Sequence, residues 1–143
     1  MDREEIQKHI PHRPPMLLVD EVYLDEAGVA HGKYRIRDNE FFTQGHFPGN
    51  PVVPGVILCE IMAQSCTMLM LDDIPGNDTL YRAIEDVKFK NIVRPGDLCE
   101  ITARITDKKA GLYFAEAKLE VGGKMCCKGK LTFALVPKKQ PQE

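Results

Sequence analysis

A run of apolar residues between Val56 and Leu71 constrains the fold of this chain more than any other feature of the sequence. Apolar side chains occupy nearly every helical position of the run, and Glu60 and Gln64 are its most polar members. At 1.5 Å per residue, an α-helix over this range would be about 24 Å long. Because a helix that is apolar on every side has to be enclosed by other structure, we predict one buried helix over 56–71. The run is shorter than the roughly 20 residues of a membrane span, so we expect no such span.

Much of the remaining chain alternates between apolar and polar residues, which is typical of strands with one buried and one solvated face. This pattern occurs at residues 29–37, 100–106, 115–121 and 130–133, and two further strands are expected at the aliphatic run 16–24, broken by Asp20 and Glu21, and at 80–90. Turn signals separate the last of these segments, at 109–111 and at the two-residue hairpin signal Gly122-Gly123. Amphipathic strands of this kind favour antiparallel pairing. The sequence therefore predicts an α+β fold, with an antiparallel sheet of five or six strands wrapped around one long apolar helix.

The length and composition indicate one domain. The chain has 143 residues, close to the commonest domain size, so we expect a single domain over 1–143. Asp2 is a suitable N-cap for an accessory helix within 1–10, and the segment 136–143 has little to bury and is expected to be a disordered tail. The 19 basic and 21 acidic residues give a net charge of −2, which argues against a nucleic-acid partner bound through phosphate neutralisation.

Cysteine usage and the first residues of the chain indicate its compartment. The 5 cysteines are an odd number, and they form neither a CxxC pair nor a zinc-ligand pattern with histidine. We expect them to be reduced and to act as small apolar residues. The chain opens with Met-Asp-Arg-Glu-Glu rather than with a basic leader followed by an apolar stretch. A cytoplasmic location is therefore predicted.

Two polar residues stand out because simple packing does not require them. His46 lies in the loop 45–55, which is rich in proline and glycine and therefore has a strongly restricted backbone. Glu60 lies in the second turn of the apolar helix, where an unpaired carboxylate is costly and desolvation would raise its pKa. The N–H groups at the start of this helix, near Gly55, point outward and can hold a developing oxyanion.

Each of these residues also has a purely structural interpretation. His46 alone can be a loop histidine that satisfies backbone groups. Glu60 alone can be an exposed residue or one favoured by the positive end of the helix dipole, and Gln64, one turn further on, can form a structural hydrogen-bonding stripe with it. Together they supply an imidazole, a carboxyl group and an oxyanion donor. This set suits removal of a proton beside a carbonyl and departure of a nearby hydroxyl.

The sequence offers no competing chemistry. It contains no serine or cysteine nucleophile with a plausible base, no glycine-rich phosphate loop and no metal-ligand spacing. We therefore expect an enzyme that works without a metal or a cofactor.

Residues 44–64, QGHFPGNPVVPGVILCEIMAQ, resemble the active-site signature of the 3-hydroxyacyl-(acyl carrier protein) dehydratases of type II fatty acid synthesis, in the FabZ-type branch. The segments PHRPPMLLVDEV, NEFFTQGHFPG and VKFKNIVRPGD match the same family in order, so the resemblance covers most of the chain. It implies a hot-dog fold, in which an antiparallel sheet wraps a long helix. It also implies conversion of a 3-hydroxyacyl chain on acyl carrier protein to the trans-2-enoyl form.

The resemblance further implies roles for particular residues. His46 matches the catalytic histidine, Glu60 the catalytic carboxylate and Gly55 the glycine whose N–H holds the thioester carbonyl. Glu60 favours the branch that only dehydrates, because the related dehydratase-isomerases carry aspartate at this position. The substrate-binding residues expected in an acyl tunnel along the helix are Gly55, Val56, Phe47, Pro54 and Gln64.

The family pattern also implies partners. Two chains would form a homodimer in which His46 of one meets Glu60 of the other, and three such dimers would form a hexamer. Acyl carrier protein is acidic, so a basic rim at the tunnel mouth should attract it. Lys88, Lys90 and Arg94 are candidates for this rim, although a solvated strand edge is the simpler explanation of these charges.

The sequence departs from the family pattern at two places near the expected tunnel. Pro14-Pro15-Met16 stands where an aromatic residue often precedes the proline, and Val53 stands where methionine or phenylalanine is frequent. Both can alter tunnel gating or the preferred acyl length. The rival functions are a hot-dog thioesterase, which would hydrolyse the same kind of thioester, and a non-catalytic module that binds acyl chains or acyl carrier protein.

Overall fold

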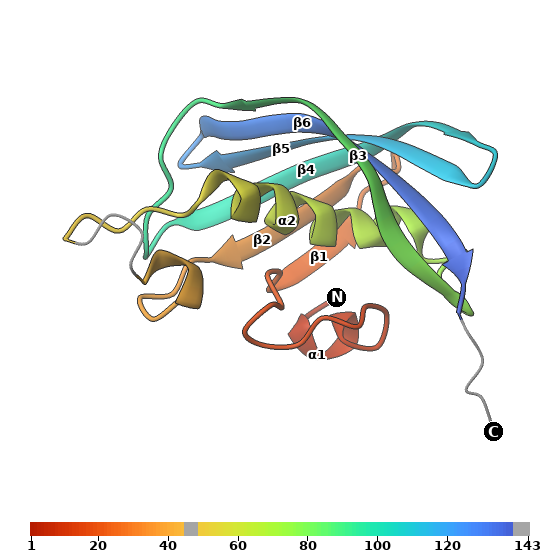
Figure 1. Ribbon diagram of the computed structural model, residues 1–143, viewed down its shortest axis with the longest axis horizontal. Helices are drawn as coiled ribbons and strands as arrows, with labels where there is room; N and C mark the ends of the chain where they lie inside the picture. The colour runs from red at the N-terminus through yellow and green to blue at the C-terminus, as the bar shows by residue number, and fades with distance from the viewer. Residues whose placement is uncertain (45–48, 139–143) are drawn as a thin grey trace.

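The computed structural model describes residues 1–44 and 49–138. Six strands form one sheet in the order β1-β2-β4-β5-β6-β3, and every neighbouring pair is antiparallel. The main helix α2 lies across one face of this sheet (Figure 1). The strands are β1 (Glu21–Leu24), β2 (Ala30–Arg35), β3 (Asn77–Phe89), β4 (Leu98–Lys109), β5 (Leu112–Val121) and β6 (Lys124–Pro137). The helices are α1 (Arg3–Ile6), α2 (Gly55–Ser65) and the 3-10 helices η1 (Phe41–Thr43) and η2 (Cys66–Met70).

The predicted apolar helix is present, but it is shorter and less enclosed than expected. The α-helix ends at Ser65, and residues 66–70 continue it as a tighter 3-10 helix, which is common at helix ends. Ile61 and Met62 are 0% exposed, whereas Val56 is 75% exposed. The prediction of a helix enclosed on every side is therefore wrong for a single chain. The reason is that one sheet covers only one side of a helix, so the other side needs a further layer.

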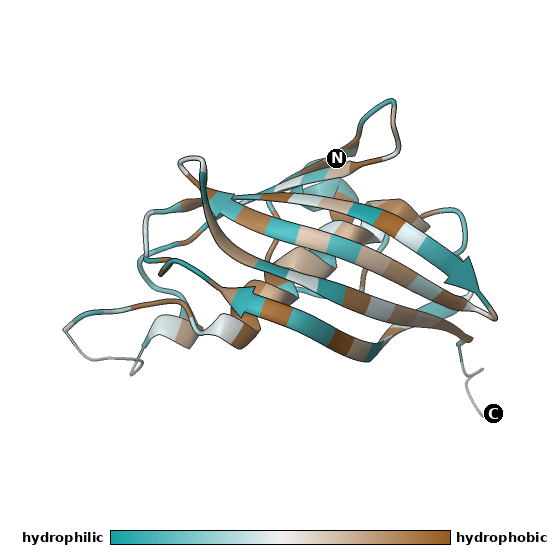
Figure 2. Ribbon diagram, turned by 90° about the horizontal axis from the view of Figure 1, so that it is seen from above, coloured by the Kyte–Doolittle hydropathy of each residue, from teal (hydrophilic) through white to brown (hydrophobic). Residues whose placement is uncertain are grey.

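Alternation along the strands sorts the side chains between the two faces of the sheet, as predicted. In β4, Ile101 and Ala103 are buried on the face that packs against α2, while Arg104 is exposed. Ala103 pairs with Ala117 of β5, which is also buried. Figure 2 shows the resulting change from hydrophobic to hydrophilic residues along the strands. The sheet therefore presents an apolar face to the helix and a polar face to solvent.

The predicted turns close two hairpins. Gly122 and Gly123, between β5 and β6, have φ values of 56° and 80°. This left-handed region is accessible to glycine without the steric penalty that other residues incur. Ala110 and Gly111 connect β4 to β5 in the same way, with φ values of 53° and 76°. Local sequence thus determines where the chain reverses.

Both terminal segments differ from the prediction within the described residues: α1 is shorter than expected and β6 is longer, while residues 139–143 of the predicted tail lie outside the described residues. Asp2 caps α1 as predicted, because its Oδ1 accepts the N–H of Glu5 at 2.9 Å, but the helix stops at Ile6. Of the predicted strand 16–24, the segment 16–20 is not part of β1. Strand β6 extends to Pro137, so residues 136 and 137 belong to the sheet rather than to the predicted tail.

A second, smaller hydrophobic cluster attaches the N-terminal segment to the rest of the fold. Its buried members are Ile6, Ile10, Leu17, Val19 and Val22. In Figure 1 this segment, with α1, runs beside the main helix. The expectation that the cysteines are reduced and act as small apolar residues is confirmed. All five lie within the described residues, and each is buried and free.

Candidate active site

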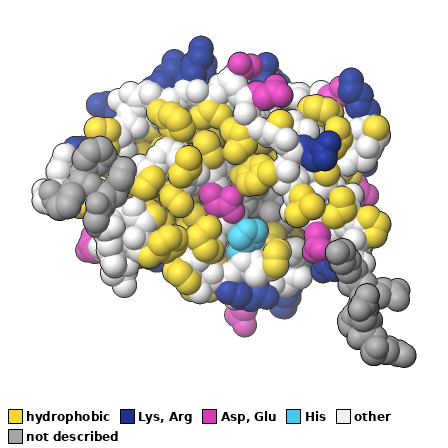
Figure 3. Space-filling model, in the orientation of Figure 1, with side chains coloured by type: hydrophobic (Ala, Val, Ile, Leu, Met, Phe, Trp, Pro, Cys, Tyr) yellow, Lys and Arg dark blue, Asp and Glu magenta, His cyan; other side chains and the backbone are white. Residues whose placement is uncertain are grey.

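Glu60 lies on α2 with its side chain 19% exposed, and it accepts hydrogen bonds from three other residues. Its Oε1 is 3.3 Å from Nε2 of His12 and 3.1 Å from Nε2 of Gln64. The hydroxyl of Tyr81, on β3, donates to its Oε2 at 3.3 Å. The face of the molecule that carries the main helix is largely hydrophobic, and an acidic side chain and a histidine lie side by side near its centre (Figure 3).

These donors reverse the predicted effect of burial on Glu60. Desolvation raises the pKa of this carboxyl group, but the hydrogen bonds from His12, Gln64 and Tyr81 and the charge of His12 lower it more. The net pKa lies below the ordinary value of 4.5. The prediction of a raised pKa is therefore wrong, because it considered the apolar helix alone and not the polar groups that other segments bring to it.

Sequence reasoning missed His12 and Tyr81 as neighbours of Glu60. His12 lies in the N-terminal segment, and Arg13 fixes the turn that carries it. Arg13 Nη1 donates to the carbonyl oxygens of Ile10 at 2.9 Å and of His12 at 2.7 Å. The motif PHRPPM marked this segment as part of the family pattern, but nothing in the sequence indicated that it folds back onto the main helix.

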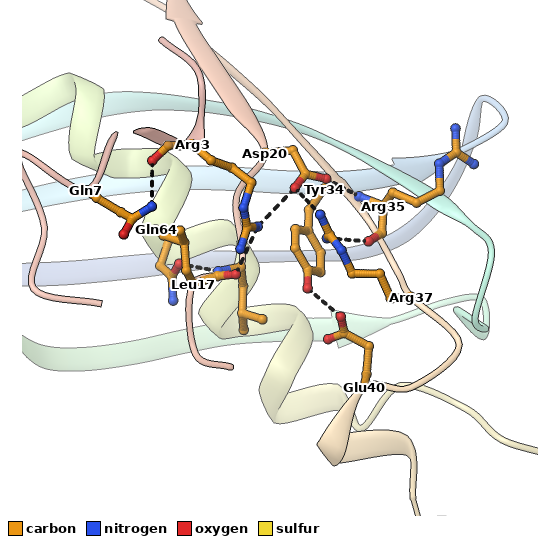
Figure 4. Close-up of polar contacts among 10 residues, drawn as sticks. Arg3, Gln7, Leu17, Asp20, Tyr34, Arg35, Arg37, Glu40 and Gln64 are labelled. Atoms are coloured by element: carbon orange, nitrogen blue, oxygen red, sulfur yellow. Dashed lines mark hydrogen bonds and ion pairs between the residues drawn. The ribbon is translucent and has the colours of Figure 1, made fainter. Parts of the chain in front are cut away.

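Gln64 is predicted to bind substrate, but the structure engages its amide fully with the protein. Its Oε1 accepts the N–H of Leu18 at 2.7 Å, and its Nε2 donates to the carbonyl oxygen of Met16 at 2.8 Å as well as to Glu60. Gln64 is buried, and it connects the segment after His12 to α2. This arrangement corresponds to the structural hydrogen-bonding stripe that the sequence left open. Figure 4 shows Gln64 pointing toward the N-terminal segment.

Gly55 and Val56, at the start of α2, line a cavity of about 850 Å³ together with Phe89 of β3. The first intrahelical hydrogen bonds run from Ile57 and Leu58 to the carbonyl of Pro54. The N–H groups of Gly55 and Val56 therefore precede them, as oxyanion donors at a helix start would. A Cβ at position 55 would lie 2.8 Å from the Phe89 ring, so this position is suited to glycine. Pro54 is not among the residues that line the cavity.

His46 and Phe47 lie outside the described residues. The segment that leads to them is held by polar contacts around Tyr34. The Tyr34 hydroxyl donates to Oε1 of buried Glu40 at 2.7 Å, and Arg37 stacks over the Tyr34 ring with its guanidinium carbon 4.9 Å from the centroid (Figure 4). Burial and the Glu40 carboxylate raise the pKa of Tyr34, which keeps this hydroxyl a donor.

The two halves of the candidate site line different cavities within one chain. Glu60, His12 and Tyr81 border a cavity of about 400 Å³. Gly55 borders the larger one, which Glu60 does not line. The residues of the expected basic rim are also divided: Lys90 and Arg94 lie beside the cavity at Gly55, whereas Lys88 lies in a groove on the sheet with Lys118 and Lys128.

Comparison with known proteins identifies the family. A family model described as ApeI-like, ApeI dehydratase, matches residues 24–130. A relative from Latilactobacillus sakei, named 3-hydroxyacyl-[acyl-carrier-protein] dehydratase FabZ, is 40% identical over 138 residues, which cover 94% of this chain and 99% of the relative. The chain belongs to the FabZ family of dehydratases. FabZ proteins from Clostridioides difficile and Streptococcus equi are 41% and 43% identical, each over 94% of this chain and 97% of the relative.

Solved structures of much lower identity share the fold of this FabZ family member. The dehydratase heterocomplex ApeI:P from Xenorhabdus doucetiae has a TM-score of 0.76 at 16% identity, covering 93% of this chain and 91% of that one. A thioesterase from Pseudomonas aeruginosa has a TM-score of 0.71 at 15% identity, covering 96% of each chain. These likenesses confirm the predicted hot-dog fold. No helix in the described part of the chain has the length and apolar character to cross a membrane.

Proposed function

We propose that this protein removes water from 3-hydroxyacyl-acyl carrier protein to give the trans-2-enoyl thioester, a step of fatty acid elongation in the cytoplasm. The observation that carries the proposal is the position of Glu60. A carboxylate with three donors lies on a mostly apolar helix, beside a cavity, in a chain of the FabZ family. Five buried and free cysteines support a reducing compartment.

In this proposal, His46, Gly55 and Glu60 each perform one step of the dehydration. His46 removes the C2 proton of the acyl chain, and the Gly55 N–H at the helix start stabilises the negative charge that develops on the thioester oxygen. Glu60 delivers a proton to the C3 hydroxyl as it leaves. Val56 and Phe47 line the acyl tunnel, whose apolar walls exclude water from the reacting atoms.

We further propose that two chains join through β3 to complete each site. This strand is at the edge of the sheet, and its exposed apolar residues are Leu80, Tyr81, Ile84 and Phe89. An unpaired edge with apolar side chains is suited to pairing with another strand. Since Gly55 and Glu60 line separate cavities in one chain, a second copy at this edge would bring the helix start of one chain to the carboxylate of the other.

The dimer can be tested by comparing the two edges of the sheet. Ile84→Asp on β3 should weaken the dimer and lower kcat, because it places a charge in the apolar interface. Leu24→Asp is the matched control, since Leu24 is an exposed apolar residue on β1, at the opposite edge. Light scattering after gel filtration gives the mass, which also distinguishes a dimer from the hexamer that the family resemblance predicts. An Ile84→Asp protein with the mass and kcat of the wild type would reject the arrangement.

Acyl carrier protein approaches, in this proposal, through the cavity at Gly55. Lys90 and Arg94 border that cavity, and opposite charge accelerates the encounter with an acidic partner. Replacing both with glutamate should raise the KM for the carrier protein at low salt. Lys118→Glu is the control, because Lys118 lies on the sheet away from this cavity. Equal KM values in the wild type, the Lys90 and Arg94 double variant and Lys118→Glu would show that Lys90 and Arg94 do not attract the carrier protein.

The activity itself is tested with purified protein and 3-hydroxybutyryl-acyl carrier protein, following the enoyl product and free thiol together. His46→Ala and Glu60→Gln should each lower the rate at least about 100-fold. Glu26→Gln, in an exposed turn, is the control for the loss of a carboxylate and should react at the wild-type rate. Release of free thiol without enoyl product would identify a thioesterase, and tight binding without either product would identify a binding module.

A further inference from the structure

Glu60 in this structure is poorly suited to act as an acid by itself. Its carboxyl group accepts hydrogen bonds from three side chains, and its pKa lies below the ordinary value. A carboxyl group in this state is ionised at neutral pH and carries no proton, whereas departure of a hydroxyl as water needs a group that gives one. The proton must therefore reach Glu60 from a neighbour.

His12 is the neighbour that can carry this proton. Its Nε2 lies 3.3 Å from Glu60 Oε1. Gln64 is an amide and does not titrate, and the pKa of Tyr81 is raised by burial and by the Glu60 charge. Imidazole is the side chain that gains and loses protons near neutral pH. Among the three donors to Glu60, His12 is thus the one with the required chemistry.

A second observation singles out His12. Its Nδ1 is buried and has no hydrogen-bond partner within residues 1–44 and 49–138. A buried ring nitrogen without a partner is costly, and such groups in native proteins often serve a function. The chain nevertheless fixes this histidine in place, because Arg13 Nη2 donates to the carbonyl of Gln7 at 3.0 Å while Nη1 donates to that of Ile10. Stability alone therefore does not account for an imidazole at this position.

We propose that His12 is a positioning residue that holds the Glu60 carboxyl group and supplies it with a proton, so that the His12–Glu60 pair is the acid of the dehydration. This inference rests on the proposed function. The C2–H bond breaks, its proton passes to His46, and its electron pair forms the C2–C3 double bond. The C3–O bond breaks, and the hydroxyl leaves as water with the proton that His12 Nε2 passes through Glu60. Solvent then reprotonates His12 and takes the proton from His46, so the net product besides the enoyl chain is one water.

The other titratable groups around the pair do not replace His12 in this role. Within the described residues, the ion pair of His12 is with Glu60. In the described part of the chain, Tyr81 is the one other titratable group here with a hydrogen bond or ion pair to Glu60. The titratable or charged side chains that border the cavity besides the pair are Lys8, His9, Arg13, Asp78, Tyr81 and Lys138, and Cys59 precedes Glu60 on α2.

His12→Gln tests the proposal, because glutamine keeps an N–H donor near Glu60 but cannot carry a proton. We expect kcat at pH 7 to fall at least about 10-fold while KM stays within about twofold. The alkaline limb of the kcat profile should move to lower pH, since the proton must then reside on Glu60 itself, and the acid limb should stay. His31→Gln is the matched control: it makes the same change on β2, and His31 does not border this cavity. Its kcat and pH profile should match the wild type.

Carboxyl-carbon NMR gives a measurement that does not depend on turnover. The pKa of Glu60 should rise in His12→Gln, because the main donor that lowers it is removed, and should stay unchanged in His31→Gln. If His12→Gln lacks the circular dichroism of the folded protein, His12→Asn replaces it. A wild-type kcat in the variant, or an unshifted pKa of Glu60, overturns the proposal. If the wild-type protein forms no enoyl product, the proposed function fails instead, and the NMR shift alone decides whether His12 controls Glu60.

Discussion

The contact between Gly32 of β2 and Ser65 at the end of α2 allows a quantitative test of how the helix is held on the sheet. Both residues are buried, and a Cβ added at Gly32 would lie 2.2 Å from Ser65 Oγ and 2.9 Å from Ser65 Cβ. Ordinary van der Waals contacts between such atoms are about 3.5–4.0 Å. Rotating the Ser65 hydroxyl away removes the first overlap but not the second. Gly32→Ala must therefore push β2 and α2 apart.

The cost of this overpacking follows from the packing of protein cores. Inserting a methyl group into a filled core destabilises by about 1–3 kcal/mol. For a chain of this length, about 4 °C of Tm corresponds to 1 kcal/mol, so the Tm should fall by about 4–12 °C. Ser65→Gly removes both atoms that the new Cβ would meet, although glycine in a helix costs about 1 kcal/mol. In the double variant the two changes should therefore be less than additive.

Thermal unfolding of the two single variants and the double variant at one protein concentration measures this coupling. Gly32→Ala combined with Ser65→Gly should melt above Gly32→Ala alone. Gly32→Ala combined with Ser65→Ala should recover less, because the Cβ of residue 65 remains. A Gly32→Ala protein that melts with the wild type, or a double variant with purely additive losses, would refute the reasoning.

Three further predictions concern the site and its approach. Because the folded pKa of Glu60 is lowered, its carboxylate stabilises the fold above the unfolded pKa, and this contribution is lost as the pH falls through the folded pKa. Glu60→Gln should therefore make urea stability less dependent on pH below 4.5, and an equally steep loss would contradict this. Tyr34→Phe removes the 2.7 Å donor to buried Glu40 and should cost about 1–3 kcal/mol in urea unfolding, so an unchanged midpoint would count against it. Gly55→Ala would displace the Phe89 ring, which is 55% exposed in the single chain. It should change stability by less than about 1 kcal/mol but lower kcat/KM about 10-fold or more, and wild-type kcat/KM would exclude a role for the helix start.

Features that depend on neighbouring residues in the sequence were predictable. The alternation in β4 determines which of Ile101 and Thr102 faces the helix, because successive side chains of a strand point to opposite faces. Gly122-Gly123 determines a tight turn, because few other residues adopt a positive φ freely. The apolar character of α2 likewise required a sheet to cover it.

The surroundings of Glu60 were not predictable in the same way. The sequence indicates an apolar helix around this carboxyl group and hence a raised pKa, whereas the structure adds donors from two distant segments that lower it. His12 lies beside Glu60 in a segment that Gln64 ties to α2 through Met16 and Leu18. No sequence pattern near His12 distinguishes a histidine that contacts Glu60 from an exposed loop histidine.

The sequence by itself determined the elements of this protein, their buried and solvated faces, and the family to which its motifs belong. Periodicity and turn chemistry act over a few residues, so a linear pattern is sufficient to specify them. Tertiary structure alone decided that Val56 remains exposed, that Gly55 and Glu60 line separate cavities, and that His12 pairs with Glu60. Charge, desolvation and hydrogen bonding depend on which distant segments meet in space, and that is settled only when the whole chain packs.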